Sequence, residues 1–408
     1  MKTSLDHLRL ASFKTIAFSA LAVCVFSQTA FADVSFTPSV ATELRYFPES
    51  PAYDGQLENF QPSIVFSGEG RWTSDDRRKR VRFEPFLRLD AQDNERTHFD
   101  VRELTYSQRF SDFDLLVGNG QIFWGVAESR NVVDVINQFD VVENNDETDK
   151  LGQPLIRLGK FTDIGRFEAY YLPFFRERTF PGSDGRQRTA LIVDTDEAEY
   201  ERGGEEFAGD FALRYKHQID KFDIGAHVFY GTARTPFFEV SSDGLRLVPV
   251  YQELAQGGVD VQWTSDAWLL KFEGITANQS GDTFLSTVAG FEYTFFDVKQ
   301  SGIDIGLLTE VLYDGRDQDE TALNLFENDV FVGSRITWND VEESELLLGA
   351  IVDWETGSTF SSIEYETRID DNMKFEAEAQ YLASPDNNAP LEAVERDSNV
   401  TLRLTRFF

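Results

Sequence analysis

The most constraining feature of the chain is a two-residue alternation of apolar and polar side chains, repeated along most of its length. It is clearest over residues 373–382, which read MKFEAEAQYL. One parity holds Met, Phe, Ala, Ala and Tyr, and the other holds Lys, Glu, Glu and Gln. Because a strand directs successive side chains to opposite faces, this period of two predicts strands with one apolar and one polar face.

The polar faces are too charged for a packed protein core. Arg80, Arg82, Glu84, Arg88 and Asp90 share one parity, and burying such charges costs several kcal/mol each. A water-filled lumen removes that cost, so we expect an all-β, transmembrane antiparallel β-barrel with its apolar side toward lipid. A secreted sandwich or propeller is the alternative, but no fixed motif recurs with the period of a repeat protein.

The pattern predicts about 18 strands, and 16 also fit it. Short connections alternate with long ones, as expected for periplasmic turns and extracellular loops. The expected strands are 34–47, 60–73, 79–91, 99–110, 113–123, 153–162, 165–173, 207–218, 221–232, 253–264, 267–276, 285–296, 302–313, 329–338, 343–353, 359–369, 373–382 and 398–408.

Residues 1–32 have the organisation of a signal peptide. A basic start precedes an apolar run over 16–26 and an Ala-Phe-Ala cleavage site. That run is too short for a transmembrane helix. We therefore expect 33–408 to be a single barrel domain in the cell outer membrane. The one cysteine, Cys24, lies in the leader, so we expect no disulfide.

Composition and the last strand suggest the partners. The net charge of −33 disfavours nucleic acid, and 37 phenylalanines suit the aromatic girdles of a barrel in lipid and lipopolysaccharide. Phe408 follows the alternating Val400, Leu402 and Leu404, which resembles the C-terminal signal read by the barrel-assembly machinery. Arg406 departs from that signal, which usually has an apolar residue there.

The third expected outward connection, residues 124–152, is long and divided in character. Ser129 is placed to cap a short helix that carries Val132, Val133 and Ile136 on one face. An acidic segment follows. A wide barrel leaves an aqueous hole, and an apolar patch lets this loop dock on the inner wall and narrow it. The alternative is an acidic loop solvated outside the cell.

Inward-facing arginines offer a counterpart to the acidic segment. An acidic loop opposite a basic wall would set a transverse field that orients solutes and sorts ions. The alternative is that the arginines pair with neighbouring glutamates. The expected constriction residues are Asp134, Asp140, Glu143, Asp146, Glu147, Arg80, Arg82 and Arg88.

The same tract carries a resemblance to a known family. Gly118-Asn119-Gly120-Gln121, Trp124-Gly125, Asp134, Asn137 and Asp140 resemble a Gly-x-Gln, Trp-Gly, Asp-x-x-Asn-x-x-Asp pattern in a largely uncharacterised family of proteobacterial outer-membrane β-barrels. The likeness covers some 25 residues. Gly120 replaces the family's usual Arg, and Gln138 its usual Pro. The resemblance implies a pore-like or transport barrel of unknown substrate.

We therefore expect a porin-like channel, monomeric or homotrimeric, for passive diffusion of small hydrophilic solutes, with cation preference. The alternatives are a specific channel for an organic or hydrophobic substrate, favoured by an apolar strip in the lumen, and a structural or adhesin-like barrel, favoured by a lumen packed shut. An enzyme is not expected. His98 beside Asp100 is the only candidate dyad, and no motif for a metal or cofactor occurs.

Overall fold

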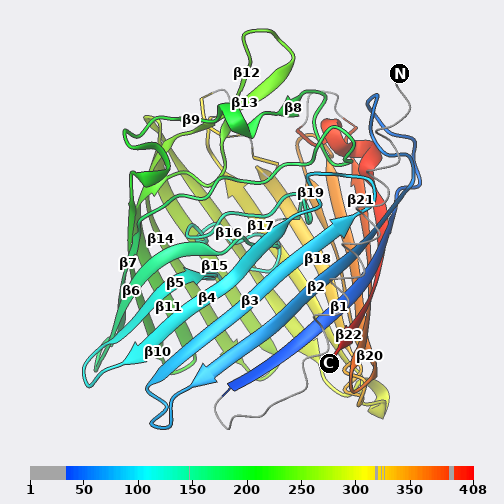
Figure 1. Ribbon diagram of the computed structural model, residues 1–408. Coiled ribbons are helices and arrows are strands. Elements are labelled where there is room, and N and C mark those ends of the chain that lie inside the picture. Colours follow the sequence, from blue (N-terminus) through cyan, green and yellow to red (C-terminus); the bar gives the residue numbers. More distant parts are fainter. Residues whose placement is uncertain (1–33, 147, 318–319, 323, 326, 386–389) are drawn as a thin grey trace.

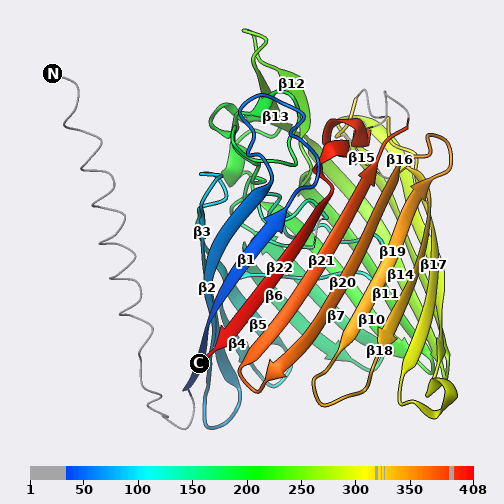
Figure 2. The same cartoon turned by 90° about the vertical axis from the view of Figure 1, so that its right-hand side faces the viewer.

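The computed structural model describes residues 34–146, 148–317, 320–322, 324–325, 327–385 and 390–408. The expected leader therefore lies outside the described residues. Within them, one 18-stranded antiparallel sheet closes on itself, because β1 (Val34–Tyr46) pairs with both β2 (Phe60–Thr73) and β22 (Asn399–Phe407). Figure 2 shows β22 beside β1 at this seam. The predicted barrel is confirmed, with 18 strands rather than 16.

The other barrel strands follow in chain order, and each pairs with its neighbours in the ring. Their bounds lie within a few residues of the predicted ones. They are β3 (Lys79–Asp90), β4 (Phe99–Arg109), β5 (Asp114–Gly120), β6 (Gln153–Thr162), β7 (Gly165–Leu172), β10 (Asp210–Ile219), β11 (Phe222–Thr232), β14 (Glu253–Ser265), β15 (Trp268–Gln279), β16 (Asp282–Phe295), β17 (Asp304–Asp314), β18 (Asn328–Thr337), β19 (Glu345–Asp353), β20 (Thr359–Asp370) and β21 (Met373–Ala383).

The alternation in the sequence becomes an apolar exterior and a polar interior. On β11, Val228 and Tyr230 are about half exposed, whereas His227 and Phe229, which alternate with them, are buried. On β21, Tyr381 is 57% exposed and Gln380 only 3%. An apolar outer surface of this kind requires a hydrocarbon surrounding, and a closed barrel satisfies every backbone group within it. Among the described residues, no helix is long and apolar enough to cross a membrane.

The two rims of the barrel differ, as expected from the lengths of the connections. The rim that holds Val34 and Phe408 carries short turns, such as 220–221 between β10 and β11. By the usual asymmetry of these barrels it is the periplasmic rim. Phe408 continues the pairing of the closing strands, since its amide donates to the carbonyl of Pro38 at 3.0 Å.

The opposite, extracellular rim carries the long loops. Two of them contribute to a small sheet, in which the hairpin β12–β13 projects above the rim (Figure 1). Four short 3₁₀ turns complete the described secondary structure. The elements are β8 (Ile192–Val193), β9 (Glu199–Tyr200), β12 (Phe237–Val240), β13 (Arg246–Tyr251), η1 (Thr195–Glu197), η2 (Glu205–Phe207), η3 (Val298–Gln300) and η4 (Pro390–Asp397).

Candidate functional site

The connection between β5 and β6, residues 121–152, runs through the interior of the barrel and is called loop 3 below (Figure 1). Its side chains and backbone bind inward-facing residues on strands from both sides of the ring. One set of contacts involves β1, β3 and β4, and the other involves β15, β17 and β18. Loop 3 therefore crosses the lumen from wall to wall.

The first anchor is a buried ion-pair cluster centred on Arg88 of β3. Its guanidinium donates to Glu143 of loop 3 at 2.8 Å and to Glu43 of β1 at 2.7 Å, and also to the hydroxyl of Ser63. Arg96 donates to Glu43 at 2.8 Å. The side chains of Arg88 and Glu143 are only 2% and 5% exposed. Bidentate pairing of this kind satisfies charges that would otherwise be costly to bury.

Asp140 forms a second contact on the same wall. Its carboxylate pairs with Arg102 of β4 at 2.5 Å and accepts a hydrogen bond from the hydroxyl of Thr179 at 2.6 Å. Burial alone would raise the pKa of Asp140, but hydrogen bonding by His98 and the charge of Arg102 hold it well below its usual value. Asp140 is therefore ionised over the whole physiological range.

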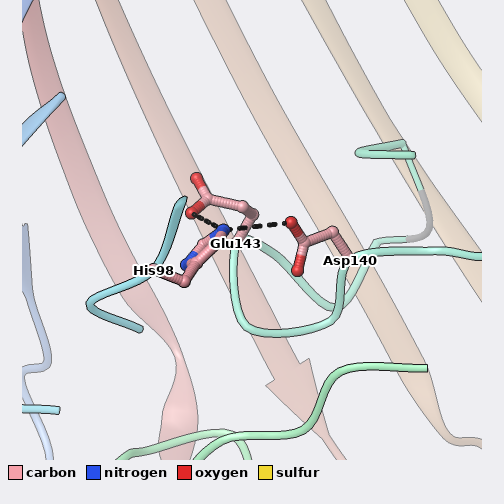
Figure 3. Close-up of side chains that lie close together, drawn as sticks. All are labelled: His98, Asp140 and Glu143. Carbon is pink, nitrogen blue, oxygen red and sulfur yellow. Dashed lines mark ion pairs between the residues drawn. The ribbon is translucent and has the colours of Figure 1, made fainter. Parts of the chain in front are cut away.

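His98 lies between these two acidic residues, as Figure 3 shows. Its Nε2 is 3.3 Å from Asp140 and 3.7 Å from Glu143, while Nδ1 lies 3.1 Å from the carbonyl oxygen of Arg96. Burial disfavours the imidazolium, yet the hydrogen bond and charge of Asp140, helped by Glu143, raise its pKa. His98 and Asp100, the one candidate dyad in the sequence, are not paired, and His98 contacts loop 3 instead.

These three side chains also have the composition of a metal site, since one ligand atom of each lies within 4.8 Å of the others. Arg88, however, already pairs with Glu143, and Arg102 already pairs with Asp140. A cation would have to displace two guanidiniums, and their charges would repel it. The cluster is therefore better suited to holding loop 3 than to binding a metal.

Two glutamates of the opposite wall bind the backbone of loop 3. Glu273 of β15 accepts hydrogen bonds from the amides of Val126 and Ala127 at 2.6 and 2.9 Å. Glu310 of β17 accepts from the amides of Glu128 and Ser129, both at 2.8 Å, and from the hydroxyl of Ser129. Carboxylates make strong acceptors for backbone amides, so these residues fix the position of the chain.

The apolar part of loop 3 packs into a core inside the barrel. Val133 and Ile136 are fully buried against strand residues such as Leu155, Leu254 and Ile275. The predicted helix after Ser129 is wrong, since residues 129–140 contain no helix. Ser129 bonds to Glu310 instead of capping, and backbone–wall contacts replace the hydrogen bonds that a helix would make.

The motif residues that carried the resemblance hold the loop in shape. Asn137 accepts from the amide of Ile122 and donates to the carbonyls of Gly120 and Leu151, which ties together the two ends of the loop. Gly125 has φ of +140°, and a Cβ there would lie 2.0 Å from the side chain of Asn131. A side chain at this position would therefore disturb the turn into the lumen.

Trp124 and Asp134 complete this arrangement. Trp124 is 1% exposed, and its ring packs against Tyr170 and His227. Asp134 forms an ion pair with Lys150 near the far end of the loop. Burial raises the pKa of Asp134 despite the opposing charge of Lys150.

A cavity of about 600 Å³ runs beside loop 3. It extends from Arg82, in the periplasmic half of β3, to Gln279, the last residue of β15 at the extracellular rim. Of the expected constriction residues, Arg82, Asp134 and Asp146 line it. Arg88, Asp140 and Glu143 lie in the buried cluster, Arg80 is exposed at the periplasmic end of β3, and Glu147 lies outside the described residues.

Three glutamates that contact loop 3 or its anchor were not expected from the sequence: Glu43, Glu273 and Glu310. Each has the inward parity of its strand, and Glu310 stands between two buried apolar residues, Leu308 and Leu312. A lone carboxylate on an apolar stretch of inner wall signals a partner in the lumen. That partner is a backbone segment, which alternation cannot reveal.

Comparison with known proteins shows the fold alone. No protein-family model and no curated protein match the chain. Among solved structures, Acinetobacter baumannii OccAB3 is 9% identical over 93% of this chain and 100% of that one, with a TM-score of 0.50. Pseudomonas aeruginosa OpdQ, at 10% identity, covers 92% and 98% with a TM-score of 0.49. A closed barrel with an apolar exterior is the architecture of the outer membrane, and the chain is an outer-membrane β-barrel.

Proposed function

We propose that the protein is a porin-like channel through which small hydrophilic solutes diffuse passively, and that loop 3 sets the width of its passage. One observation carries this proposal. Loop 3 is bound to opposite walls of the barrel, and the cavity beside it has lining residues from Arg82 of β3 to Gln279 of β15. Charged side chains of both signs line this cavity, as in a water-filled passage.

We also propose that the channel prefers cations. Acidic residues such as Glu143, which are bound to arginines, do not produce this preference, and two glutamates on another wall do. On the lumen face of β20 and β21, Glu364 lies directly opposite Glu378. Loop 3 reaches this wall through Asn144, which donates to Glu378 at 3.1 Å and to Asp146 at 2.8 Å. Adjacent carboxylates raise the local concentration of cations in a narrow aqueous space.

A specific channel for an organic substrate is the second candidate, because apolar side chains do occur inside the barrel. Val288, Leu308 and Phe331 form a buried inner-wall cluster. Ala127 and Val132 of loop 3 pack against this cluster, so much of its apolar surface serves to dock the loop. The observation therefore favours a diffusion channel with a docked loop.

Reconstitution in a planar bilayer tests the channel proposal. We expect discrete conductance steps in salt and a reversal potential of cation-selective sign under a salt gradient. A barrel that never conducts would instead favour a structural role. Whether it acts as a monomer or a homotrimer is tested by its mass in detergent.

Phe408 is proposed as the residue recognised by the barrel-assembly machinery. It lies at the periplasmic rim with a ring that is 54% exposed. Deleting Phe408 is expected to lower the amount of barrel in the outer membrane, and normal assembly of the deletion variant would refute this role.

A further inference from the structure

The outer surface of the barrel has an apolar groove of about 740 Å³ across β6, β7, β10 and β11. The strand register explains the hollow, because Ala169 and Ala226 lie beside larger side chains on the neighbouring strands. Adjacent residues form two rows across these four strands, the upper one Leu158, Ala169, Leu213 and Val228, and the lower one Lys160, Phe167, Tyr215 and Ala226.

Lys160 gives this groove a charged end. It lies two residues before the end of β6 at the periplasmic rim, with the outward parity of Leu158, and it is exposed. No ion pair involving Lys160 is found among the described residues. A cation at the edge of an apolar surface extends its amine to the membrane interface, where phosphate groups lie.

We propose that this groove, defined by Ala169, Ala226 and Lys160, binds one anionic phospholipid of the periplasmic leaflet. An acyl chain lies over the two alanines, and Lys160 pairs with the headgroup phosphate. The aromatic pair Phe167 and Tyr215, with ring centroids 5.0 Å apart, stands between Lys160 and Ala226 in the lower row. Each buried methylene adds to the affinity, and the lysine adds selectivity for negative headgroups.

The shape and charge of the groove favour a lipid over a second copy of the chain. The hollow at Ala169 is flanked by Leu158 and Leu213 on the neighbouring strands, and a single acyl chain is thin enough to lie between them. A second barrel would also bury Lys160 in an apolar interface, and an unpaired buried cation is costly. A flexible acyl chain with an anionic headgroup meets both requirements.

Native mass spectrometry of the full-length protein with phosphatidylglycerol tests this assignment. We expect wild-type protein to retain a lipid that is lost when the groove is filled by Ala169→Phe with Ala226→Phe. Lys160→Gln is expected to weaken phosphatidylglycerol binding by about fivefold while leaving a neutral diacylglycerol unaffected. The matched control places phenylalanine at Ala255 and Ala289, which are exposed on β14 and β16.

Two results would overturn the proposal. Equal loss of lipid in the control variant would show only general coating of the barrel by lipid. Loss of an oligomer in the groove variant, with lipid binding unchanged, would assign the groove to a second copy of the chain. Neither result depends on whether the barrel conducts ions.

Discussion

Arg102 and Glu310 stand on opposite walls of the barrel, and one loop is bound to both. Arg102 is on β4, and Glu310 is on β17, nine strands away in either direction around the 18-stranded ring. Arg102 pairs with Asp140, and Glu310 accepts hydrogen bonds from Glu128 and Ser129. The loop is thus held at both ends of a lumen diameter, which makes its anchors the natural targets for mutation.

The Arg88 cluster is expected to contribute strongly to stability. Arg88→Met leaves Glu43 and Glu143 buried without their main partner, and breaking a buried ion pair costs about 3–5 kcal/mol. The unfolding midpoint, read from heat-modifiable migration in gels, should fall accordingly. Arg80→Met is the matched control, because Arg80 is exposed and should change stability by no more than about 0.5 kcal/mol. Equal effects of the two variants would contradict the assigned role of the cluster.

Glu273 and Glu310, which bind loop 3 on the wall opposite Arg88, should affect the mobility of the loop more than the stability of the barrel. Glu273→Gln with Glu310→Gln replaces the carboxylate acceptors of six amide and hydroxyl hydrogen bonds by weaker neutral amides. We expect larger current fluctuations and a higher mean conductance in single-channel records. Glu292→Gln, a neighbouring change on β16, should leave the records unchanged. If the double variant gives currents as steady as those of the wild type, these hydrogen bonds do not hold the loop.

The position of His98 predicts a pH dependence of loop docking. Because its folded-state pKa is raised, its contribution to stability is complete below the usual value of 6.5 and is lost as pH rises through the raised pKa. Asp140 stays ionised throughout, since its pKa is lowered. The stability difference between wild type and His98→Gln should therefore be larger in mild acid than in alkali. A difference independent of pH would contradict the ion-pair role.

Ion selectivity should respond in opposite directions to changes on two walls. Glu364→Gln with Glu378→Gln removes facing carboxylates and should reduce cation preference. Arg82→Gln removes a cation that lines the cavity from β3 and should increase it. Both shifts should fade in concentrated salt, because the Debye length falls from roughly 10 Å at 0.1 M to roughly 3 Å at 1 M. Reversal potentials provide the measurement, and shifts of the same sign would exclude a shared passage.

The strands could be predicted from sequence because their signal is local. Over 373–382 each residue reports its own face, and the structure places Tyr381 outside and Gln380 inside. The loop anchors could not be predicted in this way. Glu143 and Arg88 are 55 residues apart, and Glu273 lies 147 residues from Val126, so only the closed barrel brings them together.

The predicted opposition of an acidic loop and a basic wall was only partly informative. Both sets of residues occur, but Glu143 bonds directly to Arg88 instead of facing it across water. Arg88 and Glu143 therefore set up no field across the lumen, because opposite charges brought within reach form an ion pair. Arg82 and Asp146 both line the cavity, and a field between these two residues stays a prediction. The short helix after Ser129 was expected from the spacing of its apolar residues alone. Wall carboxylates such as Glu310 accept hydrogen bonds from backbone amides of this segment, and the sequence does not show that these acceptors lie nearby.

The central claim, that loop 3 restricts a passage through the barrel, is tested most directly by single-channel conductance after removal of residues 126–150. Residues 121–125 with a short linker can join the two strands, because Gly120 and Gln153 are paired where β5 and β6 meet the loop. We predict that the shortened protein still inserts as a barrel and conducts several times more current per channel than wild type. Unchanged conductance in a correctly inserted barrel would contradict the claim and place the passage elsewhere.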